Sequence, residues 1–138
     1  MHPFLFKRDS GALLLEGDRC RFRVWAPHAH RVDVRILSPE PGVQSLDAIS
    51  DGYHEGELHG VAPDSRYHYR VYRKDLQDSG KGYVDRADPA SRSQPEGVHG
   101  PSQVVSGHFK WNDAGWSGMA LRHYILYELH VGAFTAQG

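Results

Sequence analysis

Four aromatic residues could do binding chemistry, because an aromatic ring offers a large apolar face at low entropic cost and a sugar ring can stack on it. They are Trp25, Tyr53, Tyr69 and Tyr72. Core packing accounts for most of them equally well. Trp25 ends a strand-like pattern beside the turn at Pro27, which favours packing in the core or at a domain interface over ligand contact. We retain Trp25 and Tyr53 as the candidate substrate-binding residues.

A second candidate group lies in residues 124–131, an apolar run typical of a β-strand. Glu128 and His130 share one face of this run, since side chains alternate along a strand. In a parallel barrel that face can point into the lumen, beneath the end where active sites are built. Both residues would then support a site from the lumen. A buried ion pair without catalytic duty is the simpler interpretation.

The remaining patterns predict neither a metal centre nor a cofactor. Among ten histidines, His54, His59 and His68 occupy positions expected to face outward from strands, and no cysteine or carboxylate cluster completes a ligand set. The sequence contains no Ser-His-Asp order typical of a catalytic triad. It also contains no P-loop and no dinucleotide-binding motif. The single cysteine, Cys20, alternates with Phe22 along a strand pattern, so we expect a small buried residue rather than a reactive thiol.

Charge and hydropathy exclude two classes of partner. Sixteen Lys and Arg against seventeen Asp and Glu give a net charge of -1, and neither sign gathers into a long run. We therefore expect no binding to nucleic acid or to a membrane. No stretch has the apolar length of a membrane span, and residues 1–8 place their basic side chains after a short apolar patch, the reverse of a secretory signal. These features predict a cytoplasmic protein.

The elements that must position the candidate residues are strands. Alternating apolar residues mark two strands in succession, 19–25 and 31–36, and a third at 67–72. Turn signals such as Asp51-Gly52 recur about every ten residues, and no window predicts a convincing amphipathic helix. This texture predicts an all-β fold, an immunoglobulin-like β-sandwich.

The alternating strand pattern ends after Asp85. Residues 88–102 contain three prolines without any periodicity, which predicts an irregular connector. We expect a sandwich domain over residues 1–110. Residues 111–138 are then a linker and the first strand of a larger (β/α)8 barrel, because a strand at 124–131 finds no partner within a sandwich.

Three motifs carry a family resemblance. Phe22-Arg23-Val24-Trp25-Ala26-Pro27 resembles the opening strand of the immunoglobulin-like domain that precedes the catalytic barrel in starch- and glycogen-acting members of the α-amylase superfamily. The connector 88–103 and the segment 127–135 resemble the malto-oligosyltrehalose trehalohydrolase family more closely than other members. The stretch from Gln94 to Ser102 is the most specific part.

The resemblance implies a retaining glycoside hydrolase that cuts the α-1,4 bond next to the terminal trehalose of an α-1,4-glucan-type oligosaccharide. In such enzymes one carboxylate is the nucleophile and a second is the acid and base. The family takes both from later barrel strands, so the resemblance implies no catalytic residue within 1–138 and no activity for this segment alone. We also expect the sandwich to serve mainly by packing on the barrel, with weak or no glycan affinity of its own, because Trp25 and Tyr53 are its only candidate stacking residues and packing explains each better.

Two alternatives remain open. A glycogen branching or debranching enzyme shares the order of domains, and the connector 88–103 argues against it. A free-standing glycan-binding module is the alternative from a different class, and the strand predicted at 124–131 argues against that, because it has no place in a sandwich that ends near residue 110.

Overall fold

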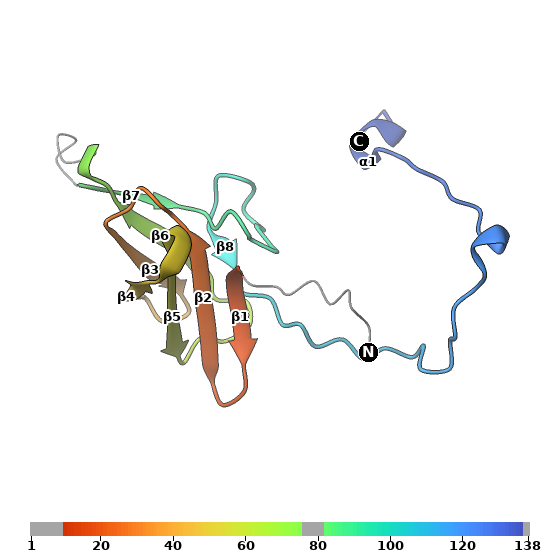
Figure 1. Cartoon of the computed structure of the whole chain (residues 1–138), viewed down its shortest axis with the longest axis horizontal. Helices are drawn as coiled ribbons and strands as arrows, with labels where there is room; N and C mark the ends of the chain where they lie inside the picture. Colours follow the sequence, from red (N-terminus) through yellow and green to blue (C-terminus); the bar gives the residue numbers. More distant parts are fainter. Residues whose placement is uncertain (1–9, 76–81, 137–138) are drawn as a thin grey trace. The chain divides into compact units, whose positions relative to one another are not determined.

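The computed structural model of the chain describes residues 10–75 and 82–136 (Figure 1). The chain divides into two units, Met1–Gly107 and His108–Gly138. The basic and apolar features noted in residues 1–8 lie outside the described residues.

The first unit is built from short strands, which confirms the all-β prediction. They are β1 (Gly11–Leu15), β2 (Arg19–Trp25), β3 (Arg31–Ser38), β4 (Gly42–Ala48), β5 (Tyr53–His59), β6 (Arg66–Tyr72), β7 (Tyr83–Arg86) and β8 (Ser102–Gln103). A single turn of 3-10 helix, η1 (Ser50–Gly52), joins β4 to β5. No longer helix occurs in the described part of this unit.

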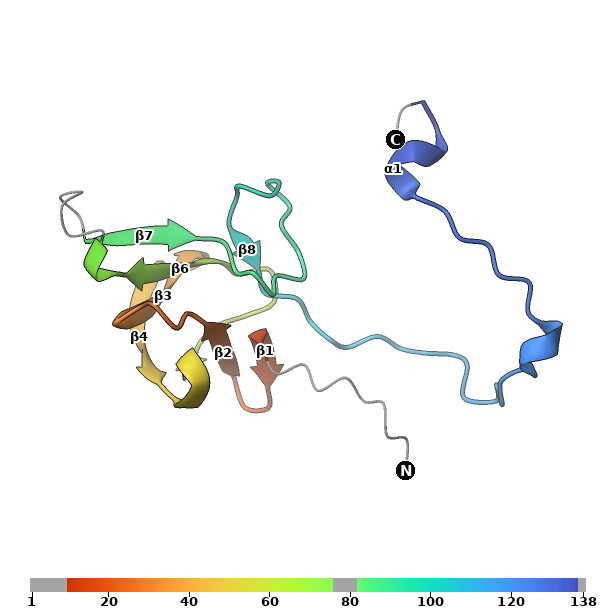
Figure 2. The same cartoon turned by 45° about the horizontal axis from the view of Figure 1, so that its top comes forward.

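The strands form one sheet that curls on itself, with the order β1-β2-β5-β4-β3-β6-β7 and with β8 on the edge of β6. All of the pairings are antiparallel. The two halves of the sheet are continuous rather than separate, because β4 pairs with β3 along its length and also with β5 through Asp47 and Ala48. Figure 2 shows β1 and β2 on one side of the curl and β6 and β7 on the other.

The core lies inside the curl. Alternation along β2 and β6 buries one side of each strand, as the sequence predicts. In β3 the apolar side is buried too, and Asp33 on the opposite side is also buried (0% exposed), hydrogen-bonded to Arg31 and Tyr72. The buried side chains include Cys20, Phe22, Val24, Val32, Val34, Ile36, Tyr67 and Tyr69. Phe22 packs edge-on against Tyr67 with ring centroids 5.1 Å apart. Burial raises the pKa of the Cys20 thiol to about 12, so this cysteine is a core residue and not a nucleophile.

Two strand features differ from the sequence-based expectations. Strand β1 is not predicted, because the three consecutive leucines at 13–15 show no alternation. His54 was expected to face outward, but it is only 4% exposed and lies opposite Val24 in the register of β2 and β5. Burial lowers the pKa of His54, which favours the neutral imidazole inside the core.

The connector after β7 is irregular, as predicted, but it is hydrogen-bonded to the strands. Asp88 is 3% exposed and accepts a hydrogen bond of 2.6 Å from the Tyr67 hydroxyl. Its own backbone N–H donates to the Ser102 hydroxyl at 2.9 Å. The Arg92 guanidinium donates to the backbone carbonyl of Ala12 at 2.7 Å, and Ala12 lies on the edge strand β1. The connector therefore links β6, β8 and β1.

The second unit has little regular structure in its described residues. It contains a 3-10 turn at Leu121–His123 and a four-residue helix, α1 (Val131–Phe134). The segment before α1 is not a strand. Its backbone is extended at Tyr124 (φ -80°, ψ 140°) and at His130 (φ -96°, ψ 111°), yet no strand ladder forms there. A strand requires a hydrogen-bonding neighbour, and 124–130 has no ladder partner among the described residues.

Candidate functional site

Trp25 and Tyr53 lie opposite each other at the end of β2 and the start of β5. They share the outer face of the sheet, because the neighbours Val24 and His54 both point into the core. The Trp25 side chain is 59% exposed, so it does not pack in the core of this unit, and packing at a domain interface stays a prediction. The structure thus brings the two candidate residues together on an open surface.

Two turns hold the Trp25 indole in place. Its Nε1–H donates to the carbonyl oxygen of Asp51 at 3.0 Å. The Ala26 N–H donates to the carbonyl of Gly52 at 2.9 Å, which joins the turn after β2 to the turn before β5. Gly52 (φ 79°) packs so tightly that a Cβ there would lie 2.7 Å from the Pro27 Cβ. The polar edge of the indole is therefore satisfied and much of its apolar area stays open to solvent.

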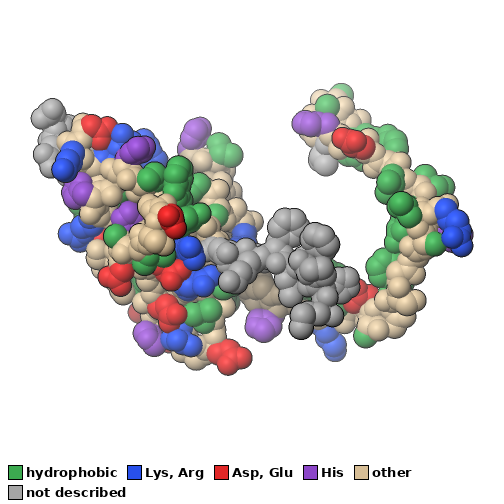
Figure 3. Space-filling view, in the orientation of Figure 1, with side chains coloured by type: hydrophobic (Ala, Val, Ile, Leu, Met, Phe, Trp, Pro, Cys, Tyr) green, Lys and Arg blue, Asp and Glu red, His purple; other side chains and the backbone are tan. Residues whose placement is uncertain are grey.

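Tyr53 is less available than Trp25. The Arg23 guanidinium lies 4.6 Å from the centre of the Tyr53 ring and occupies one of its faces. Arg23 is also 3.6 Å from the Glu55 carboxylate, and Arg21 is 3.9 Å from the same group. These contacts set Tyr53 within a row of paired charges, and Figure 3 shows acidic and basic side chains interspersed over this unit. A sugar ring would have a free aromatic face at Trp25 and a partly covered one at Tyr53.

The other two aromatic candidates do not join this surface. Tyr69 is buried in the core, which agrees with the core-packing alternative and removes it from the candidate binding residues. Tyr72 lies on the outer side of β6, where Arg31 covers its ring at 4.9 Å and its hydroxyl donates to Asp33 at 3.1 Å. Its neighbour across the ladder to β7 is Tyr83. The alternation along 67–72 already indicates that Tyr69 and Tyr72 lie on opposite faces of β6, and the structure shows which face is buried.

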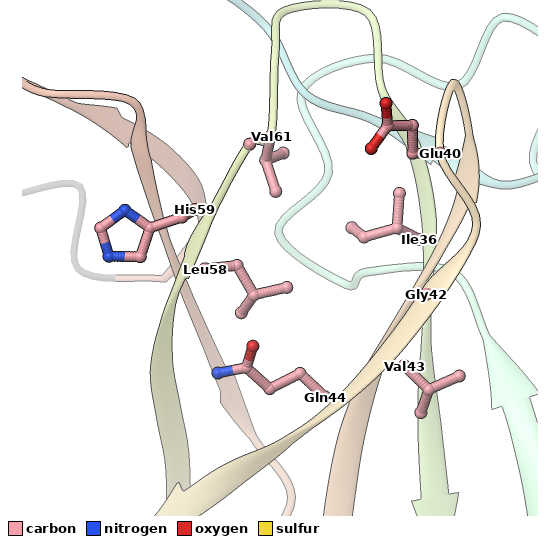
Figure 4. Close-up of a pocket in the computed structure, with 9 residues that line it drawn as sticks. Ile36, Glu40, Gly42, Val43, Gln44, Leu58, His59 and Val61 are labelled. Carbon is pink, nitrogen blue, oxygen red and sulfur yellow. The ribbon is translucent and has the colours of Figure 1, made fainter.

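A small cleft of about 200 Å³ opens where β4 and β5 diverge (Figure 4). Ile36, Leu58 and Val61 point into it, whereas the His59 ring points away. Glu40 stands at its rim and is the one carboxylate among the lining residues. Retaining glycoside hydrolysis needs two opposed carboxyl groups, so this cleft offers binding space without that chemistry.

Glu128 and His130 lie in the second unit, where both side chains are exposed. The structure contains no barrel strand there, and a role for these residues inside a lumen stays a prediction. Among the described residues no group of three or more His, Cys, Asp or Glu side chains could hold a metal ion. In the same part of the chain, no helix has the length and apolar character needed to cross a membrane.

The fold and this surface define a class: a small all-β module that presents an exposed aromatic residue. The chain belongs to the family of carbohydrate-binding module 48 (isoamylase N-terminal domain), whose sequence pattern matches residues 9–91.

The curated relatives include malto-oligosyltrehalose trehalohydrolases. The protein of that name from Saccharolobus solfataricus is 36% identical over 124 residues, covering 90% of this chain and 20% of the relative. The one from Deinococcus radiodurans is 39% identical, covering 88% of this chain and 18% of the relative. A crystal structure of a putative alpha amylase from Salmonella typhimurium matches with a TM-score of 0.73 and 33% identity, over 92% of this chain and 20% of that one. The chain thus spans about a fifth of the length of these proteins.

Proposed function

We propose that this chain is the N-terminal part of a trehalose-releasing glycoside hydrolase of the α-amylase superfamily. The observation that carries the proposal is the match, at 36% and 39% identity over most of this chain, to about a fifth of two malto-oligosyltrehalose trehalohydrolases. The whole enzyme would cut the α-1,4 bond next to the terminal trehalose of a maltooligosyl trehalose. This activity would place it in cytoplasmic trehalose biosynthesis.

Within that enzyme, residues 1–110 are an accessory module and residues 111–138 lead into the catalytic barrel. Two observations support this division. The described strand fold ends by Gly107, and the extended segment at 124–130 is apolar, as expected of a strand that pairs only with later barrel strands. Glu128 and His130 would then face the barrel lumen. The catalytic carboxylates would come from barrel strands outside this chain.

The module itself would act mainly by packing on the barrel, with a weak direct contact to substrate at Trp25 and Tyr53. Family membership supports a carbohydrate contact, and the exposed indole of Trp25 supplies its surface. Because Arg23 covers a face of Tyr53, stacking there would be confined to a small area.

The test is an assay of the protein encoded by the complete reading frame that contains residues 1–138. We expect it to release trehalose from maltooligosyl trehalose, and we expect purified 1–138 to release none. Formation or cleavage of α-1,6 branches without trehalose release would instead identify a branching or debranching enzyme. Trehalose release by 1–138 alone would overturn the assignment of catalysis to the barrel.

A further inference from the structure

A braced loop, residues 93–101, leads from the connector to β8 and projects beyond the strands beside it (Figures 1 and 2). Its base is closed by two hydrogen bonds. The backbone N–H of Gln103 donates to the Ser93 carbonyl at 2.9 Å, and the Ser93 hydroxyl donates to the Gln103 side-chain oxygen at 2.6 Å. Since Gln103 belongs to β8, the base of the loop is part of the sheet.

Hydrogen bonds also brace the loop internally. The Gly97 N–H donates to the Gln94 carbonyl and the Gly100 N–H donates to the Gly97 carbonyl, both at 2.9 Å. The Gln94 side-chain amide donates to the Val98 carbonyl at 3.3 Å. Each of the two turns, 94–97 and 97–100, is thus closed by its own hydrogen bond, and the Gln94 side chain connects one turn to the other.

A tight contact within the loop and an ion pair to the sheet constrain the loop further. Gly100 lies over Glu96 so closely that a Cβ at position 100 would stand 2.7 Å from the Glu96 Cβ. The Glu96 carboxylate is 3.3 Å from the Arg66 guanidinium on β6. These contacts hold the stretch from Gln94 to Ser102 in one loop shape.

The middle of this braced loop exposes one large apolar side chain, Val98, between Glu96 and His99, which are also exposed. Val98 is 76% exposed, the largest value among the exposed large hydrophobic side chains in the described part of residues 10–107. One exposed valine is ordinary on a protein surface. An exposed valine on a loop ordered in advance is different, because binding through it avoids the entropic cost of ordering the loop.

The position of the loop indicates what it meets. The chain leaves the strand fold through β8 and Val104, and the first unit ends at Gly107. Whatever follows Gly107 is therefore tethered close to the base of the loop. The matched relatives have about four-fifths of their length outside the region that corresponds to this chain.

We propose that the braced loop 93–101 seats this module on the catalytic domain of the longer polypeptide, with Val98 at the contact. The proposal rests on the proposed function, which supplies the catalytic domain. It assigns to the loop a docking role separate from the Trp25 surface, which remains available to substrate.

The test compares amide hydrogen exchange at residues 98 and 99 in 1–138 and in the protein from the complete reading frame. We expect exchange in the complete protein to be slower by about tenfold or more, because a docked loop is shielded. Val98→Asp should abolish this protection. Val43→Asp, at a valine on β4 that is 53% exposed, is the matched control and should leave the protection intact.

The proposal is overturned if the two proteins exchange equally at these amides, or if both substitutions act alike. Protection that depends on protein concentration would also overturn it, by pointing to a second copy. Urea unfolding of 1–138 checks that Val98→Asp leaves the module folded. Trehalose release is scored separately, so a complete protein that protects the loop but releases no trehalose contradicts the proposed function and not the docking role.

Discussion

Tyr67 and Asp88 form a buried hydrogen bond of 2.6 Å between a central strand and the irregular connector. Burial raises the pKa of the Asp88 carboxyl. Hydrogen bonds from the Tyr67 hydroxyl and the Ala90 N–H lower this pKa and so offset part of the increase. Burial also raises the pKa of Tyr67, and the neighbouring Asp88 raises it further. The phenol therefore keeps its proton and remains the donor. This bond fixes where the connector begins.

Tyr67→Phe removes that donor and leaves a buried carboxyl short of a partner. We expect it to lower the free energy of unfolding by about 1–3 kcal/mol. Urea unfolding of 1–138 measures the change. Tyr53→Phe, on the outer face of β5, is the control and should cost less than about 0.5 kcal/mol. Equal stabilities of the two variants would show that the bond to Asp88 contributes little.

Gly52→Ala should be more costly than Gly17→Ala, although both glycines have positive φ (79° and 71°). The added methyl group at 52 meets Pro27, whereas nothing lies within 4 Å of a Cβ at 17. We expect an extra loss of roughly 1–3 kcal/mol from this overpacking, measured by thermal or urea unfolding. If both variants lose the same stability, backbone strain alone explains them.

Acid should weaken the module partly through Asp85. Hydrogen bonding to Arg70 on β6 lowers the pKa of Asp85 below its usual value of 3.8. A carboxyl whose folded pKa is depressed stabilises the fold above its unfolded pKa, and loses that contribution as the pH falls through the folded pKa. Wild-type stability should therefore fall below about pH 4. Asp85→Asn should be less stable at pH 7 and show a shallower acid loss; an unchanged acid profile would contradict this.

The isolated chain should bind maltooligosaccharides weakly. We expect a dissociation constant weaker than roughly 100 μM, or about -5.5 kcal/mol, because Trp25 offers one open ring and Arg23 covers a face of Tyr53. Calorimetric titration of 1–138 measures it, with Trp25→Ala as the comparison. Tighter binding, or binding that survives in Trp25→Ala, would show that the glycan contact lies elsewhere.

Deleting residues 119–138 should leave the stability of the strand fold unchanged and improve solubility. The described strands end at Gln103, and apolar side chains of the deleted segment, such as Ile125, are exposed. The urea midpoints of 1–118 and 1–138 should therefore coincide, and light scattering should show less association for 1–118. A markedly lower midpoint for 1–118 would show that the segment belongs to the strand fold.

The sequence alone determined the faces of the central strands. The alternation of Cys20 and Phe22, and of Val32 and Val34, predicts which side is buried, because the period of two is a local property of an extended chain. The turn at Asp51-Gly52 could be predicted for the same reason, since it depends on the backbone freedom of neighbouring residues. These local signals were sufficient for the all-β class.

Only the tertiary structure decided which residues meet across the sequence. It placed His54 in the core, exposed the Trp25 indole, and linked Asp88 to Tyr67 and Arg92 to Ala12. A pattern of neighbouring residues contains no information on a partner many positions away. The strand register and the curl of the sheet bring such partners together, and burial then makes the polar contacts obligatory.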